Sequence, residues 1–315
     1  MGLRHNVGAD WYTYNFYYNN CNNPFIILNF SINSVITFII SEPIYHSINF
    51  LACKFNLGVH LVNFISAILA ITPLFYIASK QRDKFLIPVL SFSYFIVVIC
   101  MGYTRQSMAI GFVLIAVYFW TDQKFYKYLL FSTLAFLSHK SAILIFGLTL
   151  IYTANYLILF SLFIILIIVF LFFNQIIFSK FITYYGQMYS SGTLIRLFIN
   201  IIPYLIVIQF MNKLFRPREI FILNAFGIIN IIGVISLLFY PILSTIIDRL
   251  SLYTIYSQFF ILSNLSFMSK NKEYKIIKII VILLYFIYLS VWLTFSNNAG
   301  SWIPYENLIN NFDDI

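Results

Sequence analysis

The sequence predicts an all-α fold, a polytopic transmembrane helical bundle of about ten membrane segments. Of 315 residues, 61% are hydrophobic and only 9% are charged, against about 25% charged in an average soluble domain. Apolar runs of about 17 to 20 residues recur from Val59 to Phe295, each long enough to cross a bilayer as a helix. Helices satisfy their own backbone hydrogen bonds in lipid, and the long runs lack the alternation of a membrane β-barrel. Residues 1–315 are therefore expected to form a single integral membrane domain.

The expected membrane segments are the apolar runs bounded by charged residues. They cover 59–79, 85–101, 106–120, 125–137, 141–152, 155–173, 194–211, 220–240, 252–268 and 276–295, a helical bundle over 59–295. Two of them, 125–137 and 141–152, are too short to span alone unless strongly tilted. They flank Ser138-His139-Lys140-Ser141, so we expect two half-length or bent helices that meet at a polar turn lining protein or water.

Lysine and arginine give the expected orientation. Four short connections hold 12 of the 19 basic residues, namely Lys80, Arg82 and Lys84; Lys124 and Lys127; Lys213, Arg216 and Arg218; and Lys270, Lys272, Lys275 and Lys278. With ten passes all four connections lie on one side, which the positive-inside rule makes cytoplasmic. Seven ionisable residues outside these connections then lie near helix ends on the external side: Arg4, Asp10, Glu42, Arg105, His139, Asp248 and Arg249.

The two ends of the chain are expected to be external. Within residues 1–58, the range 25–41 is short and interrupted by Asn and Ser, which favours an interfacial or re-entrant element over a true span. Residues 1–23 contain no apolar signal-peptide core, and residues 296–315 form a tail. A helix that would deliver Arg4 to the external side is absent, so we expect a first membrane helix to be missing upstream.

Several function classes are disfavoured. In a membrane protein, basic residues mostly set the orientation of the chain across the bilayer. The net charge of +9 is therefore not evidence for binding to nucleic acid, and we expect no nucleic-acid partner. The cysteines Cys21, Cys53 and Cys100 are odd in number and scattered, which predicts apolar packing rather than a disulfide framework or a metal site. The sequence contains no phosphate-cradling Gly-rich loop, metal-ligand cluster or serine nucleophile elbow, so neither a metal nor another cofactor is expected.

Arg105 and His139 are the residues with the clearest chemical interpretation. Arg105 lies at the N-terminal end of an expected helix, where free N–H groups and the helix dipole favour an anion such as phosphate. The alternative is an arginine that reaches to the membrane interface. His139 is either a structural residue at a helix break or a general base or phosphate ligand. Asp248 either belongs to the same external site or simply pairs with Arg249.

Six short motifs occur in a fixed order between Arg4 and Tyr305. They are Val7-Gly8-Ala9-Asp10-Trp11-Tyr12-Thr13-Tyr14, Glu42-Pro43-Ile44-Tyr45, Arg105-Gln106-Ser107-Met108-Ala109, Leu137-Ser138-His139-Lys140-Ser141-Ala142-Ile143, Arg249-Leu250-Ser251-Leu252-Tyr253 and Ile303-Pro304-Tyr305. Together they resemble the pattern of EpsG-type proteins, a branch of the Wzy-like polysaccharide polymerases. The chain departs from that pattern in lacking the opening membrane helix and in carrying Ala9 and Ile44 in place of Thr and Gly.

The resemblance implies a bacterial inner-membrane glycosyltransferase. Such a polymerase joins undecaprenyl-pyrophosphate-linked oligosaccharide repeat units on the external leaflet, making O-antigen, capsule or exopolysaccharide. Its implied partners are that lipid-linked oligosaccharide and membrane lipids, with flippase and chain-length regulator proteins as further candidates.

On this reading the site residues have distinct roles. Arg105 and Arg249 are assigned to the pyrophosphate, with Arg4 as a further candidate, because fixed arginines stabilise the charge that develops on it. His139 is the first choice for orienting or deprotonating the acceptor sugar, while the rival bases are Asp10 and Glu42. The remaining expected substrate-binding residues are Gln106, Tyr253 and Tyr305.

Two other classes compete with this one. A lipid-linked oligosaccharide flippase or polysaccharide exporter would place charges deep in a central cavity, whereas here they cluster at external helix ends. A sugar O-acyltransferase would need a histidine facing an acyl-CoA entry on the cytoplasmic side, and the sequence shows none there.

Overall fold

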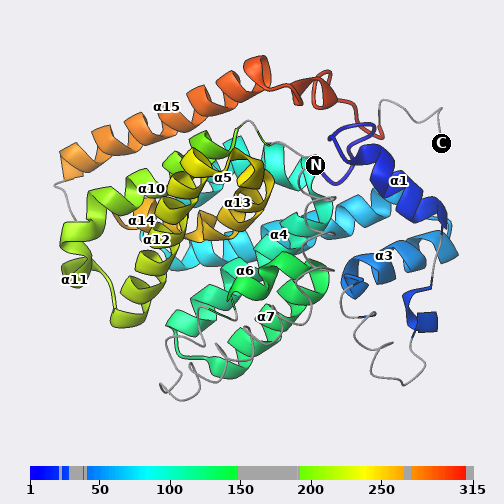
Figure 1. Ribbon diagram of the computed structural model, residues 1–315, viewed down its shortest axis with the longest axis horizontal. Helices are drawn as coiled ribbons and strands as arrows, with labels where there is room; N and C mark the ends of the chain where they lie inside the picture. The colour runs from blue at the N-terminus through cyan, green and yellow to red at the C-terminus, as the bar shows by residue number, and fades with distance from the viewer. Residues whose placement is uncertain are drawn as a thin grey trace. The chain divides into compact units, whose positions relative to one another are not determined.

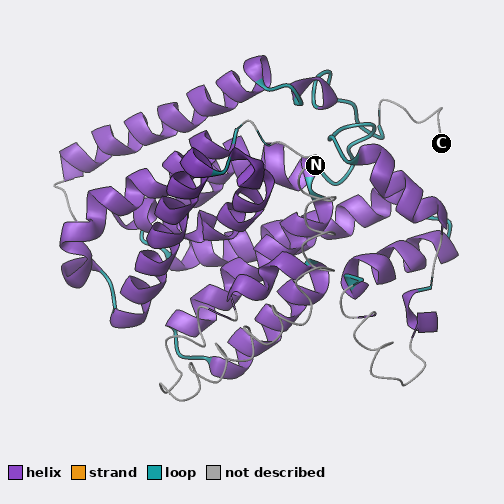
Figure 2. Ribbon diagram, viewed as in Figure 1, coloured by secondary structure: helices purple, strands orange, loops and turns teal. Residues whose placement is uncertain are grey.

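The computed structural model describes residues 1–20, 23–27, 38, 41–145, 147, 190, 192–265 and 271–309. Apart from one isolated bridge between Arg4 and Asn307, the regular structure of these residues is entirely helical (Figures 1 and 2). The all-α class is therefore confirmed. The chain divides into two compact units, Met1–Ala142 with Leu262–Ile315, and Ile143–Ile261.

The first unit contains most of the described helices. In chain order they are α1 (Trp11–Asn20), η1 (Pro24–Ile27), α3 (Pro43–Lys54), α4 (Gly58–Lys80), α5 (Leu86–Ser91), the π-helical η2 (Phe92–Cys100), α6 (Thr104–Thr121), α7 (Phe125–Ser138), η3 (Lys140–Ala142), α15 (Asn271–Phe295) and η8 (Ala299–Ser301). The second unit contains α10 (Thr193–Val207), η4 (Ile208–Phe210), α11 (Met211–Leu214), α12 (Pro217–Phe239), η5 (Pro241–Leu243), α13 (Ser244–Ser251), η6 (Leu252–Thr254) and most of α14 (Ile255–Asn264).

Four described helical stretches are long and apolar enough to cross a membrane. They are Gly58–Lys80, Thr193–Leu214, Pro217–Phe239 and Lys272–Phe295, and the shorter apolar stretch Leu86–Cys100 adds to them. These correspond to five of the ten expected segments, so the total of ten stays a prediction. The expected segment 155–173, half of 141–152 and most of the element 25–41 lie outside the described residues.

Helix α6 is the centre of the first unit. Nearly all of its side chains are buried, and it packs between α4 and α7 (Figure 1). The approach of α4 is close at Gly111, where a Cβ atom would lie 2.5 Å from the Leu69 carbonyl oxygen and 2.8 Å from Ala70 Cα. Because a side chain there would collide with backbone, glycine permits this contact between the helices.

Helices α6 and α7 form a hairpin around residues 122–124, where Gln123 has a positive φ of 61°. The turn returns the chain toward the start of α6, so that the residue after α7 lies near Arg105. Helix α7 is a short helix of 14 residues that ends at Ser138, and His139 is extended with φ −156° and ψ 123°. The expected short helix before a polar turn is confirmed, whereas half of its expected partner is not described.

Contacts distant in sequence join the ends of the elements in this unit. Asp83 accepts a hydrogen bond from Tyr274 Oη at 2.7 Å and pairs with Lys278 at 2.6 Å. Two connections that the charge pattern assigns to the cytoplasmic side therefore meet. Away from them, the C-terminal tail pairs with the N-terminal segment, as in the 2.8 Å hydrogen bond from the Gly8 N–H to the Ser301 carbonyl.

One expectation about the cysteines is wrong. Cys53 in α3 is disulfide-bonded, whereas Cys100 is a buried free thiol. An odd total still allows one pair, and the distance between two cysteines in space cannot be read from their spacing in sequence.

We expect Gly111→Ala to destabilise the first unit by about 1 to 3 kcal/mol, because the added methyl group forces α4 and α6 apart. Thermal unfolding of the purified protein in detergent measures the loss. Gly300→Ala is the matched control, since a Cβ atom at Gly300 meets nothing within 4 Å. Equal unfolding temperatures for both variants would contradict the close approach.

Candidate functional site

Glu42 is the centre of a charged cluster in the first unit. It precedes Pro43 at the start of α3 and has left-handed backbone geometry, with φ 60° and ψ 60°. A non-glycine residue held there costs on the order of 1 to 3 kcal/mol, and the following proline restricts it further. Its carboxylate makes no capping bond to the N–H groups of α3. Strained backbone thus directs a buried carboxylate away from its own helix.

Arg105 provides the first partner of this carboxylate. Its Nη1 atom donates to Glu42 Oε2 at 2.7 Å. The guanidinium carbon lies 5.2 Å from the ring centroid of Tyr17 and 5.8 Å from that of Tyr45, within the range of cation–π attraction. The Arg105 side chain is still 24% exposed. Its charge is therefore held in place but reachable from solvent.

His139 provides the second partner. Its Nδ1 atom contacts Glu42 Oε1, and the imidazole is almost fully buried. A carboxylate acceptor at Nδ1 favours the tautomer that carries its proton there, which leaves the Nε2 lone pair for another group. The cluster thus has the acid–histidine arrangement used to orient a general base.

Opposing effects act on the ionisation of Glu42. Burial alone would raise the pKa of its carboxyl group. The hydrogen bond and charge of His139, together with the charge of Arg105, outweigh burial and lower this pKa to about 2. Glu42 is consequently an anion at neutral pH and a weak proton acceptor.

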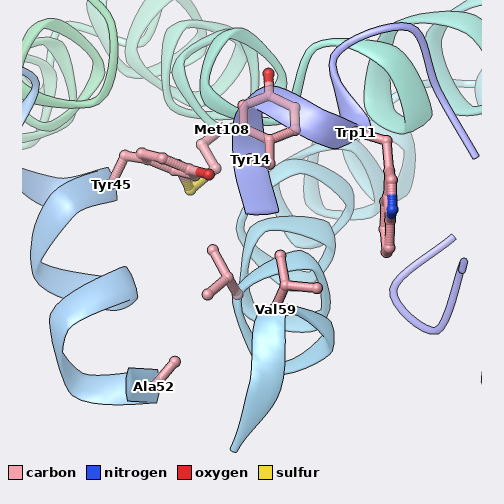
Figure 3. Packing of buried hydrophobic residues seen from close by; sticks show 7 residues of the cluster. Trp11, Tyr14, Tyr45, Ala52, Val59 and Met108 are labelled. Atoms are coloured by element: carbon pink, nitrogen blue, oxygen red, sulfur yellow. The ribbon is translucent and has the colours of Figure 1, made fainter. Parts of the chain in front are cut away.

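A hydrophobic cluster holds the elements that surround these charges. Figure 3 shows Trp11 and Tyr14 of α1, Tyr45 of α3, Val59 of α4 and Met108 of α6 packed together. The cluster fixes α1 and α3 against α4 and α6, and so places the rings of α1 and α3 beside Arg105. The sequence motifs identified Arg105 but gave no sign of the Tyr17 contact.

Arg4 has a different environment from Arg105. It is only 1% exposed, and its guanidinium donates to four protein oxygens, Val7 O, Cys100 O, Asn63 Oδ1 and Thr104 Oγ1. These hydrogen bonds connect the N-terminal segment to α4, to the end of η2 and to the first turn of α6. Burial lowers the pKa of Arg4 below its usual value. This environment favours a structural role for Arg4 over binding of a substrate anion.

Three other expected residues belong to the first unit. Asp10 is half-buried just before α1, and its carbonyl oxygen accepts the Tyr14 N–H at 3.0 Å. Gln106 is buried in the first turn of α6, next to Arg105. Tyr305 is exposed, with its hydroxyl 3.4 Å from the Met1 amino group. Their assignment to catalysis or substrate binding stays a prediction.

In the second unit the partner found for Asp248 is Arg196 rather than the neighbouring Arg249. Arg196 Nε donates to Asp248 Oδ1, and Ser190 Oγ donates to Asp248 Oδ2 at 3.1 Å. Each side chain of the ion pair is only 9% exposed. Arg196 is not among the site residues predicted from the sequence, although an arginine inside the expected span 194–211 is itself a signal of a paired or functional charge.

Arg249 and Tyr253 also lie in the second unit. Arg249 occupies the last turn of α13 and is half-buried, whereas Tyr253 is fully buried in η6. The assignment of Arg249 to pyrophosphate and of Tyr253 to substrate stays a prediction. Among the residues that the structure describes, no group of three or more His, Cys, Asp or Glu could hold a metal ion.

Comparison with known proteins identifies the family. The model of the EpsG family matches residues 1–307. No curated protein and no solved structure matches the chain.

The ionised state of Glu42 should make stability depend on pH. Because its folded pKa of about 2 lies below the ordinary value of 4.5, its contribution is fully present above pH 4.5 and is lost as pH falls toward 2. We expect this contribution to be on the order of 3 kcal/mol at neutral pH. Unfolding in detergent, measured from pH 7 to about pH 2, should show the wild type losing more stability than Glu42→Gln. Parallel pH curves for the two proteins would contradict the depressed pKa.

The buried pair in the second unit gives a separate stability prediction. Arg196→Met leaves Asp248 charged and unpaired, and we expect a loss of about 3 to 5 kcal/mol. Arg196→Met with Asp248→Leu removes both charges, so it should recover most of that loss. Thermal unfolding at matched detergent concentration compares the variants. A double variant as unstable as the single one would show that the two residues do not form an energetically coupled pair.

Proposed function

Since this chain belongs to the EpsG family, which places it in polysaccharide biosynthesis, we propose that it is a polymerase of lipid-linked repeat units. It joins undecaprenyl-pyrophosphate-linked oligosaccharides on the external leaflet of the bacterial inner membrane, in the synthesis of O-antigen, capsule or exopolysaccharide. The resemblance in the six sequence motifs is confirmed by the family match, and four described helices suit a membrane location.

The observation that carries the proposal is the convergence of Arg105 and His139 on Glu42. These residues lie on three elements or their ends, yet they form one cluster with a fixed anion at its centre. An arginine that remains partly exposed suits a phosphate group, and a histidine oriented by a carboxylate suits proton transfer. Both functions are needed when a sugar leaves a pyrophosphate carrier.

The proposed step is a substitution at an anomeric carbon. A hydroxyl oxygen of the incoming repeat unit bonds to the anomeric carbon of the growing glycan. The bond from that carbon to the pyrophosphate oxygen breaks, and its electron pair stays on undecaprenyl pyrophosphate. His139 Nε2 accepts the hydroxyl proton, and Arg105 stabilises the negative charge that develops on the leaving group.

The structure favours a positioning role for Glu42, one of the two rival bases. Glu42 is too weak a base to accept the hydroxyl proton efficiently, since its pKa is about 2, and it is better suited to orient His139 and Arg105. Asp10 stays an alternative base. In this proposal Arg249 is a second pyrophosphate ligand, while Arg4 joins the N-terminal segment to α6.

The external location of the reaction rests on charge distribution. The 12 basic residues in four connections favour a cytoplasmic position for those connections. The Asp83–Lys278 pair joins two of these basic connections. The Glu42 cluster lies at the N-terminal end of α6, away from the basic connection that follows the C-terminal end of α6. The helix dipole adds a partial positive charge at the N-terminal end, which favours a bound pyrophosphate.

Substitutions at Arg105 and His139 test the proposal. Arg105→Lys keeps the charge but loses the planar fork, so we expect a loss of long polymer of at least about tenfold, nearly as severe as in Arg105→Ala. His139→Gln keeps hydrogen bonding but cannot accept the proton, so it should lose as much polymer as His139→Ala. The measurement is the ladder of glycan lengths in cells, with protein abundance determined in parallel.

The control is Arg82→Ala, since Arg82 is an exposed arginine in a connection expected to be cytoplasmic. Loss of long chains with single lipid-linked units persisting outside the cell supports a polymerase. Repeat units trapped inside the cell would instead identify a flippase. Normal chain lengths in Arg105→Ala at matched abundance would remove Arg105 from the mechanism.

A further inference from the structure

Helix α1 contributes the Tyr17 ring beside Arg105 and exposes two other aromatic rings. Tyr12 is 77% exposed and Phe16 is 64% exposed, and they lie one turn apart on the helix. Thr13, Asn19 and Asn20 are exposed as well. We call these five residues the α1 face. It combines two adjacent rings with hydroxyl and amide groups.

The composition of the α1 face differs from that of α15, a candidate membrane-spanning helix in the same unit. The large exposed side chains of α15 are mostly aliphatic, among them Ile276, Ile279, Ile280, Leu283, Leu284 and Ile287. The α1 face has no aliphatic side chain, and a helix of 10 residues is too short to cross a bilayer. Amide groups in contact with hydrocarbon would also lose their hydrogen bonds to water. The α1 face therefore suits a partly polar ligand better than lipid chains.

The α1 face is continuous with the candidate site. Tyr17, the residue after Phe16, lies with its ring centroid 5.2 Å from the Arg105 guanidinium carbon. On the opposite side of the helix, Trp11 and Tyr14 are buried in the cluster of Figure 3 and fix the orientation of α1. A ligand that meets Arg105 and extends past Tyr17 would reach Phe16 and then Tyr12.

We propose that the α1 face is a glycan-binding subsite, which takes the sugar residues next to the pyrophosphate held by Arg105. Sugars present flat C–H faces that pack on aromatic rings, while their hydroxyl groups bond to amide and hydroxyl side chains. The face offers both kinds of group. The identity of the ligand rests on the proposed function. The proposed occupant of the α1 face is carbohydrate rather than the membrane interface.

Paired substitutions separate stacking from simple hydrophobicity. Tyr12→Leu with Phe16→Leu removes both rings but keeps apolar side chains, whereas Tyr12→Trp with Phe16→Trp keeps aromatic rings. The matched control is Phe125→Leu with Tyr126→Leu, since these residues of α7 are 59% and 87% exposed at an end expected to be cytoplasmic. All proteins are compared at equal abundance in membranes.

The first measurement is binding of a defined probe to the purified full-length protein in detergent. The probe is the oligosaccharide released by mild acid from the host's own lipid-linked repeat units, and binding is followed by saturation-transfer NMR. We expect the leucine pair on α1 to weaken binding about tenfold, with the tryptophan pair and the α7 control close to wild type. Equal binding by the leucine pair and the wild type, or no binding by the wild type, would overturn the subsite.

The second measurement is the ladder of glycan lengths in cells that carry each variant. The leucine pair should shorten the polymer, whereas the tryptophan pair should maintain it. Normal polymer and normal probe binding in the leucine pair would refute the subsite and leave the polymerase intact. If Tyr12→Gln with Phe16→Gln only lowers the abundance of folded protein in membranes while the leucine pair behaves normally, the rings anchor α1 in the interface and the proposal is wrong. Polymer in a strain lacking the chain would refute the polymerase, and the binding measurement would still decide the subsite.

Discussion

A buried guanidinium needs acceptors for its N–H groups, and in the first unit this need is met at Arg4 by oxygens from separate parts of the chain. The acceptors belong to the N-terminal segment, α4, the end of η2 and the start of α6. Because each oxygen must stay within hydrogen-bond distance, the elements that carry them are held in one arrangement. Arg105 follows directly on Thr104, one of these acceptors, so the position of the candidate site depends on this buried charge.

The Glu42 cluster uses the same physical chemistry for a different purpose. Its carboxylate is buried on a residue with strained backbone geometry at the start of α3, yet the Arg105 guanidinium and the His139 imidazole keep it ionised. Arg4 has all its described partners inside the protein, whereas Arg105 keeps a quarter of its side chain exposed. One arginine stabilises the fold, and the other is held ready for an anion. This difference decides which arginine we assign to the substrate.

Helix length also contributes to the site. Helix α6 is buried along its length in the first unit, and α7 returns antiparallel to it over only 14 residues. The return ends at the level where α6 begins, so the extended residue after α7 reaches Glu42. The short segment that looked unusual in the sequence is thus what brings the histidine into the cluster.

Local features of the sequence determined the fold class and the main site residues. Apolar runs and scarce charges are sufficient for a helical membrane protein, and ionisable residues at helix ends singled out Arg105, His139 and Glu42. Tertiary structure alone decided their pairing, because Glu42 is separated from Arg105 by 63 positions and from His139 by 97. It also placed Arg4 in the interior, gave Asp248 the partner Arg196 and stacked Tyr17 on Arg105. Patterns of hydropathy and charge can be read from neighbouring residues in the sequence. Burial and ion pairing depend on which helices pack together, and neighbouring residues do not reveal that packing.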